Sequence, residues 1–224
     1  MDQARTIPEK YVTLFDTAKR CLLIIDQLYA DFTQGLDSLT ENDGEKQDQS
    51  KIIRLYACAH GLIDFCHRYM QVIEAMPLLS KKRVEVKKLV EMCSEVTECR
   101  NYIQHIRNHL MSDDRIDYPI LGSISWIKED RNYVLFPNQA TQGHSIYGIT
   151  YDTWNKKYVC KYQITISKYQ LRIDLIYNEL KKFWEWLSSV SQIEPASVKE
   201  YQWGRAGILY SRLTEAKSIT MKDH

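Results

Sequence analysis

The stretch KKLVEMCSEVTECRNYIQHIRNHL, residues 87–110, decides the fold class of this chain. Its apolar residues recur at steps of three or four, the period of an amphipathic α-helix. They are Leu89, Cys93, Val96, Cys99, Ile103, Ile106 and Leu110. Ser80 stands where an N-cap residue is favoured. The pattern therefore predicts a long helix over about 81–112, with one apolar face for a core.

The same periodicity appears in three other segments and predicts further helices over about 7–34, 49–76 and 168–190. Pro77 closes the second helix, and Ser167 is expected to cap the last. Between the third and fourth helices, short runs rich in β-branched and aromatic residues alternate with turn residues, as in GSISWIK and NYVLFP. We therefore predict a mainly α protein, a bundle of four long helices with a small antiparallel β insertion between the third and fourth.

We expect one domain over residues 1–224, with the β insertion at 118–166 and a C-terminal extension at 193–224. In that extension, AGILYSRL fits either a strand or a helical turn. The net charge of +1 argues against a protein that coats DNA without regard to sequence. Six cysteines without a CxxC pair favour reduced thiols and a cytoplasmic location. No apolar run reaches the length of a membrane span, so no membrane partner is expected.

The third predicted helix carries an unusual polar face. On a helical wheel with the core through Ile103, Arg100 lies on the flank of the apolar face. The opposite side holds Asn101, His105 and Asn108, with Glu98 and His109 beside them. A solvated surface is the plain interpretation of such a face. However, exposed helix faces favour Lys and Glu over the weaker helix formers Asn and His, so a functional role is also indicated.

The order Arg100-Asn101-x-x-x-His105 resembles the motif of ribonucleases in the HEPN superfamily (higher eukaryotes and prokaryotes nucleotide-binding domains). These proteins are all-helical bundles. Their motif has an Arg, four to six further residues and a His, usually with a polar residue directly after the Arg, late in a core helix. The resemblance covers the four predicted helices and leaves the β insertion without a counterpart.

The resemblance implies a metal-independent endoribonuclease without a cofactor, with Arg100, Asn101 and His105 as catalytic residues. It also implies a homodimer in which two motif helices face one cleft. In this family such nucleases often act as toxins or antiviral effectors, sometimes neutralised by an antitoxin. The implied partners are therefore an RNA substrate, a second copy of the chain and an antitoxin or regulatory protein.

The residue types suit this chemistry, because RNA carries its own nucleophile, the 2′-OH. Histidine can act as base or acid near neutral pH, arginine can stabilise a phosphoryl group that gains charge, and asparagine can orient either. One helix supplies one such histidine, which also favours a twofold dimer. Further RNA contacts are expected from Asn108 and His109 and from the basic run Lys81, Lys82 and Arg83, whose plain alternative is a solvated surface.

Three alternatives remain open at this point. His60, Asp64 and His67 lie at helical spacing on the second predicted helix, where they could contribute to a metal site. The chain could be a HEPN-like bundle that binds nucleotides or a protein without cleaving RNA. It could also be a structural adaptor that uses the Tyr- and Trp-rich insertion as its binding surface.

Overall fold

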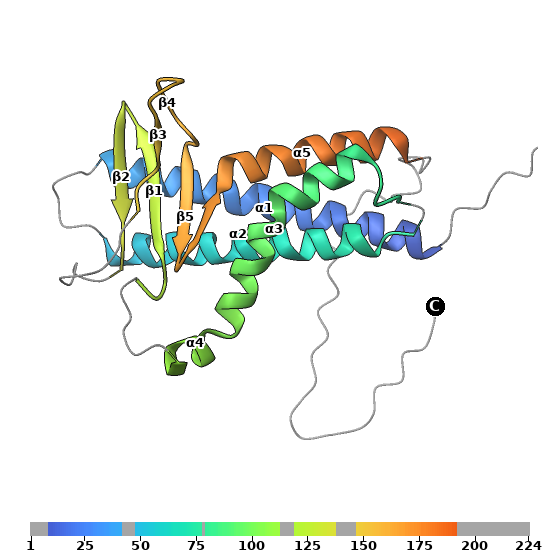
Figure 1. The fold of residues 1–224 in the computed structure, drawn as a ribbon, viewed down its shortest axis with the longest axis horizontal. Helices are drawn as coiled ribbons and strands as arrows, with labels where there is room; N and C mark the ends of the chain where they lie inside the picture. The colour runs from blue at the N-terminus through green and yellow to red at the C-terminus, as the bar shows by residue number, and fades with distance from the viewer. Residues whose placement is uncertain (1–8, 42–47, 78, 113–118, 138–146, 192–224) are drawn as a thin grey trace, which may run out of the picture. The chain divides into compact units, whose positions relative to one another are not determined.

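The structure is a computed structural model that describes residues 9–41, 48–77, 79–112, 119–137 and 147–191. In these ranges the chain is mainly helical, with five helices and a small antiparallel sheet (Figure 1). This confirms the predicted class in its coarse form. The predicted C-terminal extension at 193–224 lies outside the described residues. None of the described helices combines the length and the apolar character needed to cross a membrane.

Helices α1 (Glu9–Glu41) and α2 (Gln49–Ala75) form the longest helical pair. The prediction for α2 was accurate, but α1 continues seven residues beyond the predicted end at residue 34. The predicted loop began at Gly35, yet Leu36 and Leu39 are buried, so the apolar face continues past it. A Cβ atom at Gly35 would lie 2.8 Å from Cδ2 of Leu55. Glycine therefore permits a close approach of α1 and α2 inside a helix.

The predicted third helix is divided into α3 (Val84–Gln104) and α4 (Ile106–Ser112). The break lies at His105, whose φ of −102° and ψ of 16° depart from helical values. Ser80 does not cap α3, because Arg83 holds the N-cap position. The single helix predicted over 81–112 was therefore wrong at its start, since α3 begins at Val84, and in its last quarter. Figure 1 shows α4 turned away from the axis of α3.

The apolar face of α3 also changes near its end. Val96 and Cys99 are buried as predicted, but the next buried residue is Tyr102, and Ile103 is only half-buried. No residue of α4 is buried. The expected core positions Ile106 and Leu110 therefore do not continue the core, because the helix that would carry them inward has ended.

The sheet consists of β1 (Ser123–Lys128), β2 (Arg131–Leu135), β5 (Tyr162–Ile166) and β6 (Tyr169–Arg172) in the antiparallel order β2-β1-β5-β6. A separate hairpin pairs β3 (Tyr151–Asp152) with β4 (Lys157–Tyr158). The sheet extends beyond the predicted boundary at residue 166. Ser167 has a φ of +54° and lies in the β5–β6 turn, so it does not cap a helix. Helix α5 (Ile173–Val190) begins five residues later than predicted.

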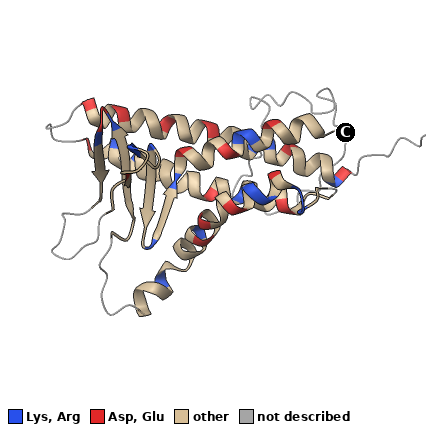
Figure 2. Cartoon of the chain, turned by 45° about the horizontal axis from the view of Figure 1, so that its top comes forward, with Lys and Arg blue, Asp and Glu red and all other residues tan. Residues whose placement is uncertain are grey.

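Side-chain contacts attach the sheet to the ends of α1 and α2. The Tyr56 hydroxyl donates to the carbonyl oxygens of Gly122 and Leu135, at 3.2 Å and 3.3 Å. The Trp126 indole N–H donates to Oγ1 of Thr40 at 2.9 Å. Helix α5 lies against α1 and α3 (Figure 1). Figure 2 shows acidic and basic residues interspersed along the helices, in agreement with the near-neutral net charge.

Candidate functional site

Arg100 lies in the last turn of α3 and faces α2. Only 22% of its side chain is exposed, and its Nε atom lies 3.5 Å from Oδ1 of Asp64. Its Nη1 atom also donates to Oε1 of Gln104, one turn further on. Asp64 in turn accepts a hydrogen bond of 2.7 Å from Nε of Arg68. The guanidinium of Arg100 is thus held at the boundary between α2 and α3.

Asn101 and His105 are both exposed. They stand one turn apart, and the His105 backbone N–H donates to the Asn101 carbonyl at 3.1 Å. Asn101 lies inside α3, whereas His105 is the residue at which the helix ends. The expected exposure of these two side chains on the side of α3 away from the core is therefore observed.

The expected second group of RNA contacts is divided by the helix break. Asn108 is exposed on α4, but its position relative to Asn101 no longer follows from one continuous helical wheel. His109 is half-buried, and its ring stacks on Tyr102 with centroids 4.5 Å apart. His109 is thus packed against α3, while Asn108 faces solvent.

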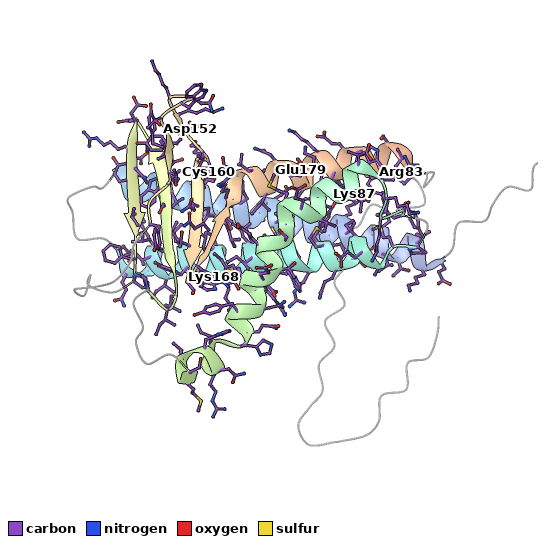
Figure 3. The ribbon with its side chains drawn as sticks, viewed as in Figure 1. Arg83, Lys87, Asp152, Cys160, Lys168 and Glu179 are labelled. Atoms are coloured by element: carbon purple, nitrogen blue, oxygen red, sulfur yellow. The ribbon has the colours of Figure 1, made fainter. Side chains whose placement is uncertain are left out.

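The basic residues Lys81, Lys82 and Arg83 are exposed, but they lie at the opposite end of α3 from the motif (Figure 3). The 21 residues of α3, at 1.5 Å per residue, separate the two groups by about 30 Å. Arg83 lies over the ring of Trp186, with its Cζ atom 5.9 Å from the ring centroid. The structure does not bring this basic run together with Arg100, Asn101 and His105.

The possible metal ligands on α2 have other partners. Nε2 of His60 lies 3.3 Å from the carbonyl oxygen of Leu121. His67 is buried, and its Nδ1 atom lies 3.2 Å from Oγ1 of Thr97. Burial lowers the pKa of His67, which favours the neutral imidazole. Among the described residues, no three His, Cys, Asp or Glu side chains are grouped so that they could hold a metal ion.

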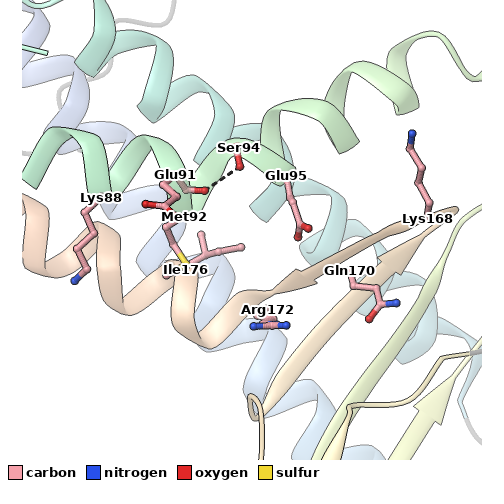
Figure 4. Close-up of a pocket in the computed structure, with 9 residues that line it drawn as sticks. All are labelled: Lys88, Glu91, Met92, Ser94, Glu95, Lys168, Gln170, Arg172 and Ile176. Atoms are coloured by element: carbon pink, nitrogen blue, oxygen red, sulfur yellow. Dashed lines mark hydrogen bonds between the residues drawn. The ribbon is translucent and has the colours of Figure 1, made fainter.

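A groove with a volume of about 610 Å³ lies between α3, β6 and α5 (Figure 4). It does not include the motif residues. Lys88 on its wall forms an ion pair of 2.7 Å with the buried Glu179. The wall mixes cations and carboxylates and consists of Lys88, Glu91, Met92, Ser94, Glu95, Lys168, Gln170, Arg172 and Ile176.

Sequence reasoning missed the contact of Asp64 with Arg100, and it missed the other residues near the motif, namely Tyr102, Gln104, Lys168 and Tyr169. Asp64 was predicted only as a possible metal ligand, and its spacing of four from Arg68 is typical of an ion pair on one helix. That spacing gives no indication of the contact with Arg100. The contacts of Lys168 and Tyr169 had no signal, because these residues were predicted to lie in a helix.

Comparison with protein-family models, curated proteins and solved structures finds no match to this chain. The resemblance to HEPN ribonucleases therefore depends on Arg100, Asn101 and His105 and on their place at the end of a core helix.

Proposed function

We propose that this protein is a metal-independent endoribonuclease of the HEPN type. The observation that carries the proposal is the joint exposure of Asn101 and His105 at the end of α3, with Arg100 held at the edge of the same turn by Asp64. A base or acid, an amide and a fixed cation thus lie within one and a half turns of helix. These are the groups that cleavage through the 2′-OH of RNA requires.

Each residue has a distinct role in the proposed reaction. His105 takes the proton of the 2′-OH or supplies the proton to the departing 5′ oxygen. Arg100 stabilises the negative charge that develops on the phosphorane. A guanidinium has five N–H donors, so Arg100 can keep its contacts with Asp64 and Gln104 and still donate to a phosphoryl oxygen. Asn101 orients the phosphate or the imidazole by hydrogen bonding.

The proposed active site is completed in a homodimer. One protomer supplies one exposed histidine at this position, whereas the reaction uses both an acid and a base. A twofold axis beside the α3–α4 break would bring together two copies of Asn101, His105 and Asn108. The 75% exposure of Met111 on α4 adds an apolar residue to the same region, which favours its burial in an interface.

The first test is cleavage of single-stranded RNA by purified protein, compared with His105→Ala. We expect the variant to lose activity because no other group at this turn replaces the imidazole. Arg54→Ala and Asn178→Ala are matched controls, since both residues are exposed on other helices and should retain full activity. Full activity of His105→Ala would remove the basis of the proposal.

The proposed cellular role is that of a cytoplasmic toxin or antiviral effector, which an antitoxin or another regulatory protein inhibits. This role follows from the resemblance. Growth arrest that depends on His105 when the chain is expressed would support it, and harmless expression of an active nuclease would oppose it.

A second candidate function is that of a catalytically inactive HEPN-like adaptor that binds a nucleotide or a protein. It is favoured by the β3–β4 hairpin, where Trp154 is 91% exposed and Tyr151 is 47% exposed. Exposed aromatic side chains are common at protein interfaces. An adaptor would bind its partner in a Trp154-dependent manner and would show no His105-dependent cleavage.

A further inference from the structure

An aromatic cluster joins the motif helix to the sheet. We define it as Tyr102 of α3, His109 of α4 and Tyr169 of β6. The Tyr102 ring stacks on His109 with centroids 4.5 Å apart and lies 5.9 Å from Tyr169. Lys168 extends the cluster, because its Nζ atom lies 5.4 Å from the centroid of the Tyr169 ring. Two consecutive helices and a strand distant from them in sequence thus bring three rings and a cation together.

The aromatic cluster flanks the proposed active site. At 100° per residue, Tyr102 lies about 200° around α3 from Arg100. Asn101 and His105 fall between these two positions on the exposed side. Arg100 therefore borders the site on the side of α2, and Tyr102 borders it on the side of β6. A nucleic-acid strand that crosses the exposed face from Arg100 would reach the aromatic cluster next.

The exposure of the cluster suits a binding surface better than a closed core. Tyr102 is buried and fixes the arrangement, while His109 and Tyr169 are half-buried and Lys168 is exposed. In Figure 4 the Lys168 side chain rises from the tip of the β5–β6 hairpin toward α3. The partly exposed rings can therefore receive a planar group beside a cation.

We infer that the aromatic cluster is a base-stacking subsite for single-stranded RNA beside the scissile phosphate. Stacking of bases on aromatic side chains tolerates any base, and a nearby cation attracts the phosphate chain. The carboxylates of Glu95 and Glu98 lie toward the middle of α3 and disfavour phosphates there. The RNA strand is thereby directed along α4, where Arg107 is exposed. The placement of this subsite beside a scissile phosphate rests on the proposed function. The binding of RNA by the aromatic cluster does not rest on it.

The experiment measures binding of a fluorescent single-stranded 2′-O-methyl RNA by the full-length protein. The methyl groups remove the nucleophile, so binding is separated from cleavage. Tyr169→Ala and Lys168→Ala should each weaken binding, with about a tenfold loss expected for the ring, and Tyr169→Phe should preserve it. Tyr147→Ala and Lys10→Ala are matched controls, because these exposed residues lie before β3 and at the start of α1, outside the cluster. Both controls should bind as the wild type does.

The outcomes distinguish this inference from the proposed function. Binding that depends on Tyr169 without any His105-dependent cleavage would support the subsite and refute the nuclease. Cleavage that depends on His105, with RNA binding unchanged in Lys168→Ala and Tyr169→Ala, would overturn the subsite alone. Lys168→Ala tests the inference even if Tyr169→Ala misfolds, because removing an exposed side chain changes the stability of the protein little. Unchanged binding in a folded Lys168→Ala protein counts against the inference even where Tyr169→Ala fails to fold.

Discussion

Arg100 at the end of α3 lies 3.5 Å from Asp64 in the middle of α2, measured from Nε to Oδ1. This contact joins the proposed cationic residue of the active site to a neighbouring helix. Asp64 also binds Arg68, so one carboxylate lies between two guanidinium groups. The orientation of Arg100 consequently depends on the packing of α2 against α3 and is not a property of α3 alone.

Asp64→Asn should therefore reduce RNA cleavage while leaving the fold nearly intact. The amide is close in shape to the carboxylate but carries no charge to hold Arg100. Ion pairs with this degree of exposure usually contribute no more than about 1 kcal/mol to stability. We expect lower cleavage with a normal unfolding temperature. Asp16→Asn is the matched control, because Asp16 forms an ion pair with Arg20 on α1. Equal activity in both variants would show that Asp64 does not position Arg100.

Arg100→Ala and His105→Ala should each remove cleavage. Loss of general acid–base catalysis slows a reaction by about a hundredfold to ten-thousandfold. His105 is exposed, so its truncation should change the free energy of unfolding by no more than about 0.5 kcal/mol. Single-turnover cleavage and denaturant unfolding measure the two effects. A large loss of stability in His105→Ala would show that this residue is structural.

The mechanism also predicts the products and the conditions of cleavage. Attack by the 2′-OH should leave 2′,3′-cyclic phosphate ends and should continue in EDTA. A substrate with 2′-deoxyribose at the scissile nucleotide should remain intact. Cleavage that EDTA abolishes, or that proceeds on the deoxy substrate, would refute the mechanism.

Self-association should occur through the exposed face of α3 and α4. Asn101→Glu should weaken the dimer, since the twofold axis would bring two carboxylates together. Asn178→Glu adds the same charge on α5 and should leave the dimer intact. Sedimentation over a range of micromolar concentrations measures the effect. A stable wild-type monomer at these concentrations would contradict the composite site.

His67 should make stability fall in mild acid. Burial, followed by the charge of Arg100, lowers the pKa of His67 below its ordinary value, although Asp64 and Glu74 oppose the shift. As the pH falls through about 6.5, the unfolded chain therefore takes up a proton before the folded protein does. His67 has no effect on stability well above that pH and reduces stability below it.

Unfolding by denaturant at pH 7.5 and pH 5.5 checks this expectation. The wild type should lose stability between the two values, and His67→Gln should lose less. His60→Gln is the control, because it makes the same substitution at a half-buried histidine of the same helix. Equal losses in the wild type and His67→Gln would show that another group causes the acid sensitivity.

Periodicity alone determined the helical regions, and the extent of α2 in particular. The alternation of apolar and polar residues is a local property that sequence displays directly. The β1–β2 hairpin was also predictable, because β-branched and aromatic runs flank a short polar turn. The helical wheel also placed Asn101 and His105 on the exposed side of α3. This prediction required only the positions of the core residues on the same helix.

Tertiary structure alone decided the end of α1, the break at His105 and the contact between Arg100 and Asp64. Gly35 and its polar neighbours predicted a loop, but packing of α1 against α2 outweighed their weak helix propensity. From the sequence, Ser167 was predicted to cap a helix. It lies in a turn because β5 pairs with β6 on either side of it. Arg100 and Asp64 are 36 residues apart, and no periodicity within one helix encodes which carboxylate of a neighbouring helix will lie beside it. Packing of the two helices supplies that information, because it fixes their register and rotation.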